Sequence, residues 1–379
     1  MKIVHVEDYF DPDAGYQINE LVTANNISDE VSIITSYNLD PFHKVYSLQR
    51  DLQFEERTGA KIIRLKSMVN ISSRLWLKGL WRQISLINPD LLFLHGIGDF
   101  KDLILFYKKM PYKTVRDCHM SWIASQNPLA KIYFFFFRHF FSPIINKSNK
   151  YEVVFALGIE EHEYLKRLGI KEYKIKYLLH GYNASNMYFD PKSREVVRKN
   201  YEINKDEIVI SYIGKFDEYK RPDLIFDIIG NIDFEVLSRY RLCLLFIGPK
   251  DEIYMKNFRE KQASIENSIH VIVDGAKDFN SLKNYYSASD ICIFPKQTTL
   301  SSIHAQVCRC PVIMENHSSN YERVVNNANL FPQGNYKKAS DILVAIIESK
   351  EYLKENNGTD VSQLESREYS NQVKMLHGL

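Results

Sequence analysis

The chain of 379 residues has little excess charge and few cysteines. Its formal net charge is +2 at pH 7, so the overall balance gives no indication of a nucleic-acid-binding protein. The five cysteines are odd in number and lack the spacing of a disulfide framework. We therefore expect buried thiols and a reducing compartment. Cys308 and Cys310 have no second pair that would complete a zinc site, and we interpret them as core residues.

Long apolar runs are also missing from the sequence. The first residues, M-K-I-V-H-V, read as a strand and lack the apolar region of a signal peptide, so we expect a cytoplasmic protein. The most membrane-like segment, residues 129–145, is too short to span a bilayer and is interrupted by Lys131, Arg138 and His139.

This segment has two interpretations. It fits a surface helix whose aromatic side contacts lipid, which would make the protein peripheral at the inner face of the membrane. It also fits a helix packed against its own sheet. Four basic residues nearby would meet anionic head groups in the first interpretation: Lys108, Lys109, Lys113 and Arg116.

What the sequence does contain is two alternating series of strands and helices, and its length suits two domains of about 150–200 residues. The strands expected in the first series are Lys2–Val6, Glu30–Thr35, Lys61–Arg64, Leu91–His95, Lys113–Asp117 and Val153–Leu157. Helical patterns between them cover Gly15–Asn25, Ser73–Asn88 and Glu160–Leu168. The second series has strands at Ile208–Ile213, Arg241–Ile247, His270–Val273, Ile291–Phe294 and Val312–Glu315. This alternation predicts an α/β protein with doubly wound parallel sheets, joined by a linker between Tyr177 and Lys199.

Residues 285–315 form the most informative stretch. A short apolar strand ends at Pro295, a polar turn covers Lys296 to Ser301, and a helix follows from Leu300 to Val307. Open α/β sheets bind anionic ligands where such a loop leads from the end of a parallel strand into a helix. We therefore expect a ligand-binding site here.

A second anion site is indicated by I-S-Y-I-G-K-F-D-E-Y-K-R-P-D-L-I-F-D-I-I, residues 210–229. A strand ends at Gly214, and the loop before Pro222 carries Lys215, Lys220 and Arg221. Three cations beside a helix N-terminus favour a diphosphate site over the alternative, a solvated basic turn.

The N-terminal half offers weaker signals. Gly15 opens a helix after a loop, but a single glycine falls far short of a G-x-G-x-x-G fingerprint. Asp11-Pro12-Asp13 has the form of an Asp-x-Asp metal motif, and we favour a structural role near the helix dipole.

Two histidines, His95 and His119, stand at the ends of expected strands, where sites assemble in such folds. Asp117 lies two residues before His119, so both side chains project from the same side of an extended chain. The pair fits a carboxylate-oriented imidazole, and the alternative is a structural histidine.

Five motifs in order give the chain a family resemblance. Residues 214–223, G-K-F-D-E-Y-K-R-P-D, resemble the G-R-L-x-x-x-K-R-P-x signature of GT-B glycosyltransferases of family 4. H-G-Y-N-A-S-N-M-Y-F resembles that family's N-G-V-D-x-x-x-F linker, and L-F-I-G-P its glycine loop. Y-Y-S-A-S-D-I-C-I-F-P and A-Q-V-C-R-C-P-V-I resemble Y-x-x-A-D-V-x-V-x-P and A-M-A-C-G-x-P-V-I.

The resemblance implies a GT-B fold of two Rossmann-like domains facing a central cleft. It implies an acceptor-side domain over residues 1–183, a nucleotide-sugar-binding domain over 184–363, and a helix over 364–379 that packs back on the first domain. The implied activity is retaining transfer of a sugar to a glycan or lipid-linked acceptor in cell-surface polysaccharide biosynthesis. No metal or other cofactor is implied, and a homo- or hetero-oligomer is left open.

The resemblance also implies roles for individual residues. His119, with Asp117, matches the histidine that faces the transferred sugar. The donor diphosphate would be bound by Lys215, Lys220, Arg221, Gly15 and Gly214. The nucleotide and sugar would be bound by Lys296, Gln297, Thr298, Thr299, Leu300, Ser301, His304 and Gly248. His95 and Tyr16 would lie on the acceptor side.

Three positions depart from the family pattern. Two glutamates seven residues apart are replaced by His304 and by Lys296, or Gln297 with a shift of one residue. A neutral imidazole can still accept a bond from a ribose hydroxyl, whereas a lysine cannot. Arg309 replaces a glycine. The alternative function is therefore a catalytically silent GT-B protein that serves as a partner or glycan-binding subunit, although the retained Lys215 and Lys220 favour an enzyme.

Overall fold

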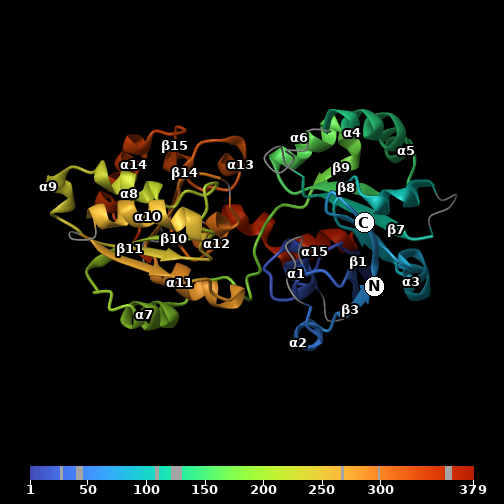
Figure 1. The fold of residues 1–379 in the computed structure, drawn as a ribbon, viewed down its shortest axis with the longest axis horizontal. Helices are drawn as coiled ribbons and strands as arrows, with labels where there is room; N and C mark the ends of the chain where they lie inside the picture. Colours follow the sequence, from blue (N-terminus) through green and yellow to red (C-terminus); the bar gives the residue numbers. More distant parts are fainter. Residues whose placement is uncertain are drawn as a thin grey trace. The chain divides into compact units, whose positions relative to one another are not determined.

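The computed structural model describes residues 1–25, 29–39, 46–106, 111–120, 130–265, 269–297, 299–354 and 361–379. Residues named above that lie outside these ranges are Lys108, Lys109, Thr298 and residue 129. The chain divides into two compact units (Figure 1). Unit 1 comprises Met1–His180 and Tyr369–Leu379, and unit 2 comprises Gly181–Glu368.

Unit 1 is built on a parallel sheet with strand order β3-β2-β1-β6-β7-β8-β9. The strands are β1 Lys2–Val6, β2 Glu30–Ser36, β3 Lys61–Leu65, β6 Leu91–Leu94, β7 Lys113–Cys118, β8 Val153–Ala156 and β9 Ile175–Tyr177. The helices are α1 Gln17–Thr23, α2 Leu48–Thr58, α3 Leu80–Ile87, α4 Ala130–Phe136, α5 Ser142–Lys147, α6 Ile159–Arg167 and α15 Tyr369–His377. Shorter helical segments are η1 Phe100–Phe106, the π-helical η2 Phe137–Phe141 and η3 Glu172–Lys174.

Helices cover both faces of this sheet (Figure 1). Strand β6, L-L-F-L, is buried along its whole length, as a strand between two helical layers requires. On one face, Tyr369, Val373 and Leu376 of α15 join a core cluster with Ile3 and Phe93. The last helix therefore belongs to the hydrophobic core of unit 1.

One expectation was wrong in unit 1: the helical pattern over Ser73–Asn88 does not begin at Ser73. An antiparallel hairpin of β4 Ser67–Ile71 and β5 Arg74–Leu77 precedes α3. Ser72 and Ser73, at the turn of the hairpin, both have positive φ angles, 50° and 61°, as tight hairpin turns require. The helix starts only after Gly79, whose φ is 77°.

Unit 2 repeats the architecture with strand order β12-β11-β10-β13-β14-β15, again parallel. The strands are β10 Glu207–Ile213, β11 Arg241–Ile247, β12 His270–Asp274, β13 Ile291–Phe294, β14 Val312–Glu315 and β15 Leu330–Phe331. The helices are α7 Pro191–Asn200, α8 Leu224–Gly230, α9 Phe234–Leu237, α10 Glu252–Ile265, α11 Leu282–Ala288, α12 Ser301–Val307, α13 Ser318–Tyr321 and α14 Tyr336–Glu348. Shorter 3₁₀ segments are η4 Phe279–Ser281, η5 Asn327–Asn329 and η7 Val361–Arg367.

In unit 2, α8, α10 and α14 lie on one face of the sheet and α7 and α11 on the other (Figure 1). The two parallel sheets confirm the predicted α/β class with doubly wound sheets. All five cysteines are buried and unpaired, which confirms their interpretation as core residues.

The strand orders fix where ligands can bind. In unit 1 the order reverses between the neighbours β1 and β6, and in unit 2 between β10 and β13. The carboxyl ends of strands at such a switch point form the usual binding crevice of open α/β sheets. Each unit therefore has one edge at which candidate residues should gather.

Candidate functional site

In unit 1, four acid or histidine side chains gather at the switch point. Glu7 follows β1, His95 follows β6, and Asp117 lies near the end of β7, two residues before His119. Since β1, β6 and β7 are neighbours in the sheet, their carboxyl ends meet at one edge. Glu7 was missed by the sequence interpretation, although its position directly after the first strand was a usable signal.

Asp117 is the centre of this group. Its Oδ2 atom lies 2.7 Å from His95 Nδ1, and its Oδ1 atom lies 3.0 Å from His119 Nε2 and accepts the Gly96 N–H at 2.6 Å. His95 Nε2 lies 2.9 Å from Nδ1 of His5. Asp117 and His95 are fully buried, whereas the side chain of His119 is 38% exposed. His95 is therefore shielded from solvent, whereas His119 is open to it.

The charges of these groups follow from their contacts. Burial opposes ionisation of Asp117, but His119 and His95 outweigh it and hold the pKa of Asp117 well below its usual value. Burial also opposes charge on His119, yet Asp117, Glu7 and Glu161 raise the pKa of His119 to about 9. Burial and the neighbouring His95 lower the pKa of His5. His119 is thus a cation at neutral pH, and it is paired with an ionised Asp117.

A second polar network supports the same edge. Lys101 Nζ is buried and pairs with Asp8 at 2.7 Å and with Asp99 at 3.0 Å. Arg116 on β7 is fully buried and binds Asp99 at 2.9 Å and Asp102 at 3.3 Å. Asp8 lies in the segment after β1, and Asp99 and Asp102 lie in the segment after β6, with Asp102 inside η1. The ion pairs therefore anchor both segments.

Glu7, His95 and His119 also offer ligand atoms within 4.8 Å of one another, an arrangement compatible with a metal ion. However, both ring nitrogens of His95 already contact other groups, Asp117 and His5. A metal would have to displace one of these contacts, so the arrangement suits hydrogen bonding better than metal binding.

The Asp-x-Asp sequence, Asp11 to Asp13, lies in the first loop of unit 1, and both of its aspartates have a protein partner. Arg50 on α2 pairs with both Asp11 and Asp13. The aspartates therefore have a structural role, with an arginine rather than a helix dipole as partner. Gly15 is half-buried, and Tyr16, which precedes α1, is 58% exposed.

In unit 2, the loop after β10 holds the predicted cations. Tyr212 donates its hydroxyl hydrogen to the carbonyl of Lys215 at 2.6 Å. Asp217 Oδ1 accepts the backbone N–H of Lys220 at 2.9 Å. Lys215 is exposed and Lys220 is half-buried. The loop backbone is therefore fixed while both ammonium-bearing side chains remain at the strand edge.

Arg221 has a partner of its own. Its guanidinium makes two bonds of 2.8 Å to the carboxylate of Asp223, which is buried. This bidentate pair satisfies the fork of the arginine. The predicted contact of Arg221 with a diphosphate therefore stays a prediction with a competing partner in the structure.

A further cation, Arg323, was missed by the sequence interpretation. It follows α13 in the segment after β14, and its side chain is largely buried. Burial lowers the pKa of Lys220 to about 8, Asp217 opposes that shift, and the positive charges of Arg323 and Lys215 add to it. A cluster of cations that repel one another in this way is a ready site for an anion.

The loop after β13 holds the residues that replace the family's glutamates. Lys296 Nζ lies 3.3 Å from Glu315 Oε1, and Glu315 also accepts the Gly334 N–H at 3.1 Å. Four further predicted ligand-binding residues are half-buried: Gln297, Thr299, Leu300 and Ser301.

His304 on α12 is only 3% exposed, with Phe279 and Tyr286 beside its ring. Burial lowers the pKa of His304 to about 4, although a hydrogen bond with the Gly181 backbone opposes the shift. His304 is therefore a neutral, packed side chain, and its contact with a ribose stays a prediction.

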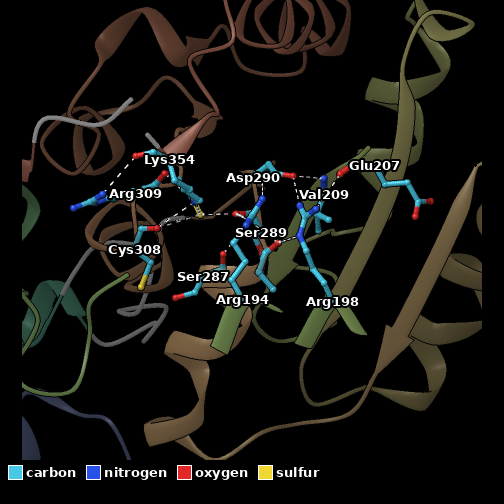
Figure 2. Close-up of polar contacts among 12 residues, drawn as sticks. Arg194, Arg198, Glu207, Val209, Ser287, Ser289, Asp290, Cys308, Arg309 and Lys354 are labelled. Atoms are coloured by element: carbon cyan, nitrogen blue, oxygen red, sulfur yellow. Dashed lines mark hydrogen bonds and ion pairs between the residues drawn. The ribbon is translucent and has the colours of Figure 1, made fainter. Parts of the chain in front are cut away.

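Figure 2 shows the polar contacts that anchor this region. Asp290, just before β13, binds Arg194 at 2.6 Å, pairs with Arg198 and accepts the Val209 N–H at 2.7 Å. At the end of α12, Lys354 donates to the carbonyls of Cys308 at 3.2 Å and Arg309 at 2.8 Å.

Arg309 has a φ of 61°, the left-handed conformation that the family's glycine would adopt without cost. The arginine lies instead over the ring of Phe189, 5.4 Å from its centroid. The end of α12 thus accommodates Arg309 in place of the family's glycine.

Known proteins share part of this chain's sequence and its fold. Residues 193–358 match the family model described as Glycosyl transferases group 1. An uncharacterised 41.2 kDa protein in the cps region of Klebsiella pneumoniae is 23% identical over 329 residues, which cover 84% of this chain and 82% of that protein.

Two solved structures share the fold over nearly the whole chain. Anabaena Alr3699/HepE, in complex with UDP and glucose, superposes with a TM-score of 0.70 at 12% identity, covering 100% of this chain and 98% of that one. WaaG, a glycosyltransferase involved in lipopolysaccharide biosynthesis, gives a TM-score of 0.64 at 12% identity, with 98% of each chain covered. The chain therefore has the GT-B fold of these structures, and a segment of unit 2, residues 193–358, is similar to glycosyl transferases group 1.

Proposed function

We propose that the protein transfers a sugar from a nucleotide-sugar donor to a glycan or lipid-linked acceptor, with retention of configuration and without a metal. The observation that carries the proposal is the cation cluster of unit 2. Lys215 and Lys220 lie after β10, at the switch point, and the charge of Arg323 acts on Lys220. A diphosphate would relieve the mutual repulsion of these cations.

The same cations supply the chemistry. When the sugar leaves, negative charge grows on the departing diphosphate, and preorganised cations stabilise that charge. His119, a cation at the edge of the other sheet, would donate a hydrogen bond to an oxygen of the transferred sugar or the acceptor. In this scheme unit 2 binds the donor, unit 1 binds the acceptor, and no metal is required.

The relatives support a role in surface polysaccharides. The Klebsiella protein is encoded in a cps region, and WaaG is involved in lipopolysaccharide biosynthesis. HepE binds UDP, which makes UDP-sugars the first donors to test. We propose the assembly of a cell-surface glycan as the setting of the reaction.

A specific observation favours the alternative, a catalytically silent partner or glycan-binding subunit. Both positions of the expected glutamates hold side chains committed to protein contacts, Lys296 to Glu315 and His304 to its aromatic surroundings. Neither offers a carboxylate to a ribose. The cation cluster argues for the enzyme, because a scaffold has no need of it.

A donor screen separates the two functions. Calorimetry with UDP-, GDP-, dTDP- and CMP-sugars measures binding, and release of free nucleotide measures slow donor hydrolysis. We expect binding and hydrolysis with one donor class. Lys220→Ala should weaken that binding about ten- to a hundredfold, since a charge-assisted bond is worth about 1.5–3 kcal/mol. The matched control is Lys192→Ala, at an exposed lysine of α7. No binding of any nucleotide sugar would favour the silent subunit.

We further propose that unit 1 contacts an anionic membrane through the segment from α4 to α5. Ile132, Phe135, Phe136 and Phe140 are each more than half exposed. Their neighbours Phe137 and Ile145 are buried in the core, so the segment has one face for its own domain and one for solvent. Among the described residues, no helix is both long and apolar enough to cross a membrane.

The charges beside this exposed apolar face indicate that it binds anionic lipid head groups. Between Cys118 and Tyr151 the sequence holds no aspartate or glutamate, while Lys131, Arg138 and Lys147 are exposed. An apolar face edged by cations only is complementary to anionic head groups.

Sedimentation with vesicles tests this contact. Binding to phosphatidylglycerol vesicles should exceed binding to phosphatidylcholine and should fall in Phe136→Ser/Phe140→Ser. The control replaces the exposed Phe234 and Ile253 of unit 2 by serine. Equal binding to both vesicle types, or unchanged binding by the double variant, would rule the contact out.

A further inference from the structure

A continuous line of contacts in unit 1 runs from the core to the surface. It starts at His5 on β1, whose Nδ1 lies 2.9 Å from His95 Nε2. It continues from His95 Nδ1 to Asp117 Oδ2 at 2.7 Å, and from Asp117 Oδ1 to His119 Nε2 at 3.0 Å. The first three residues are at most 3% exposed, whereas the His119 side chain is 38% exposed.

When His95 is neutral, the direction of each hydrogen bond in this line follows from Asp117. An ionised carboxylate only accepts hydrogen bonds, so the hydrogen between it and His95 must be on His95 Nδ1. A neutral His95 then has a bare Nε2, which must accept. The hydrogen between the two rings is therefore on Nδ1 of His5. One carboxylate thus determines the tautomers of two buried histidines.

We propose that His5 and His95 are positioning residues that act through Asp117 to hold His119 as a hydrogen-bond donor. In this arrangement Nε2–H of His119 binds Asp117, and its Nδ1–H is left to donate to an oxygen of a bound substrate, either a hydroxyl or a phosphate oxygen. The choice of substrate rests on the proposed function. The arrangement of hydrogens does not.

The surroundings fit this arrangement. Phe93 stacks on His95 at 4.2 Å and on His5 at 5.4 Å between ring centroids, which keeps the imidazole planes aligned. The groups that face His119 include the carboxylates of Asp117, Glu7 and Glu161 and the ring of His95, 6.1 Å away between centroids. These acids keep His119 protonated. Burial raises the pKa of Glu7, and the positive charge of Lys101 opposes that shift.

Nitrogen NMR of the full chain labelled in histidine tests the inference, since two-bond ¹H–¹⁵N couplings distinguish the two tautomers and the cation. The chain has 11 histidines, and single His→Asn variants assign the signals. At pH 7 we expect His5 and His95 to carry hydrogen on Nδ1 and His119 on both nitrogens. Hydrogen on Nε2 of either buried ring would overturn the proposal.

Asp117→Asn gives the sharpest result. The Gly96 N–H and His119 fix the amide oxygen on their side, so the amide NH₂ faces His95. His95 Nδ1 must then accept, and its Nε2 must donate to His5. We expect both buried tautomers to reverse and the pKa of His119 to fall by more than two units, from about 9 to below 7. An unchanged His5 would show that no relay exists.

His95→Leu covers the case in which Asp117→Asn does not fold. It removes the acceptor for His5, which should then show hydrogen on Nε2. His270→Gln serves as control, because His270 pairs with Glu207 at 3.1 Å in unit 2 and should leave all four relay groups unchanged.

Transfer activity on the same samples keeps the two proposals apart. The expected tautomers in a protein that uses no nucleotide sugar would support the relay and refute the proposed function. Reversed tautomers in an active enzyme would refute the relay alone. In active enzyme, Asp117→Asn should lower kcat at pH 7 more than it raises KM, because His119 then presents an acceptor instead of a donor.

Discussion

Gly248 lies so close to Gly214 that a methyl group on Gly248 would be 1.8 Å from the carbonyl oxygen of Gly214. The two glycines directly follow the neighbouring strands β11 and β10, and the Gly214 N–H donates to the Ile247 carbonyl at 2.9 Å. Gly248 also has a φ of 157°. The absence of side chains lets the backbones approach beside the cation loop.

Gly248→Ala should therefore damage unit 2. The added carbon meets backbone that cannot move aside, so we expect a loss of about 3 kcal/mol in the free energy of unfolding, or no folded protein. Gly230→Ala, at the end of α8 with nothing within 4 Å, is the control and should be neutral or slightly stabilising. Urea unfolding followed by circular dichroism measures both. Equal stability of the two variants would contradict the close approach.

Donor binding should depend on pH through Lys220. Its pKa of about 8 means that the ammonium is lost above that pH in the free protein, whereas a bound diphosphate would retain it. We expect a constant dissociation constant below about pH 7 and weakening by up to about tenfold per unit above pH 8. Lys220→Arg should bind donor with no such dependence, since arginine stays charged. Calorimetry across this range measures it, and a parallel slope in both proteins would exclude Lys220 as the titrating group.

The stability of unit 1 should fall as the pH rises. Because the pKa of His119 is raised from 6.5 to about 9, the folded state binds the proton more tightly than the unfolded state. The stabilisation is complete below about pH 6.5 and is lost as the pH passes about 9. Trp76, Trp81 and Trp122 all belong to Met1–His180, so tryptophan fluorescence in urea reports on unit 1 alone. Asp117→Asn should remove most of this slope.

Glu202→Gly should stabilise unit 2. Glu202 is exposed just after α7 with a φ of 56°, a conformation that costs a residue with a Cβ about 1 kcal/mol. We expect a gain of that size in thermal unfolding. Glu195→Gly, at an exposed position within α7, should lose a similar amount. A loss in both variants would mean that the side chain of Glu202 contributes more than its backbone costs.

Much of the polar group at the edge of unit 1 was predictable from strand ends. His95, Asp117 and His119 stood out because polar residues directly after buried strands gather at one edge of a parallel sheet. Glu7 satisfied the same rule after β1 and was overlooked, since a lone glutamate after a first strand belongs to no recognised motif.

Other features of the site could not be predicted from residues close together in the sequence. Arg323 acts on Lys220 across about a hundred residues of sequence, and only the order of β10, β13 and β14 brings their loops to one edge. His304 has the spacing of a ligand-binding residue, yet its ring is packed against Phe279.

The sequence by itself determined the alternation of strands and helices, the buried strands and the position of both polar loops. These depend on side-chain periodicity and turn residues, which act over a few residues. Only the tertiary structure decided which partner each charged group takes: Asp223 for Arg221, Glu315 for Lys296 and Asp117 for both His95 and His119. Such pairings depend on distances between segments far apart in the chain, and burial then sets their protonation.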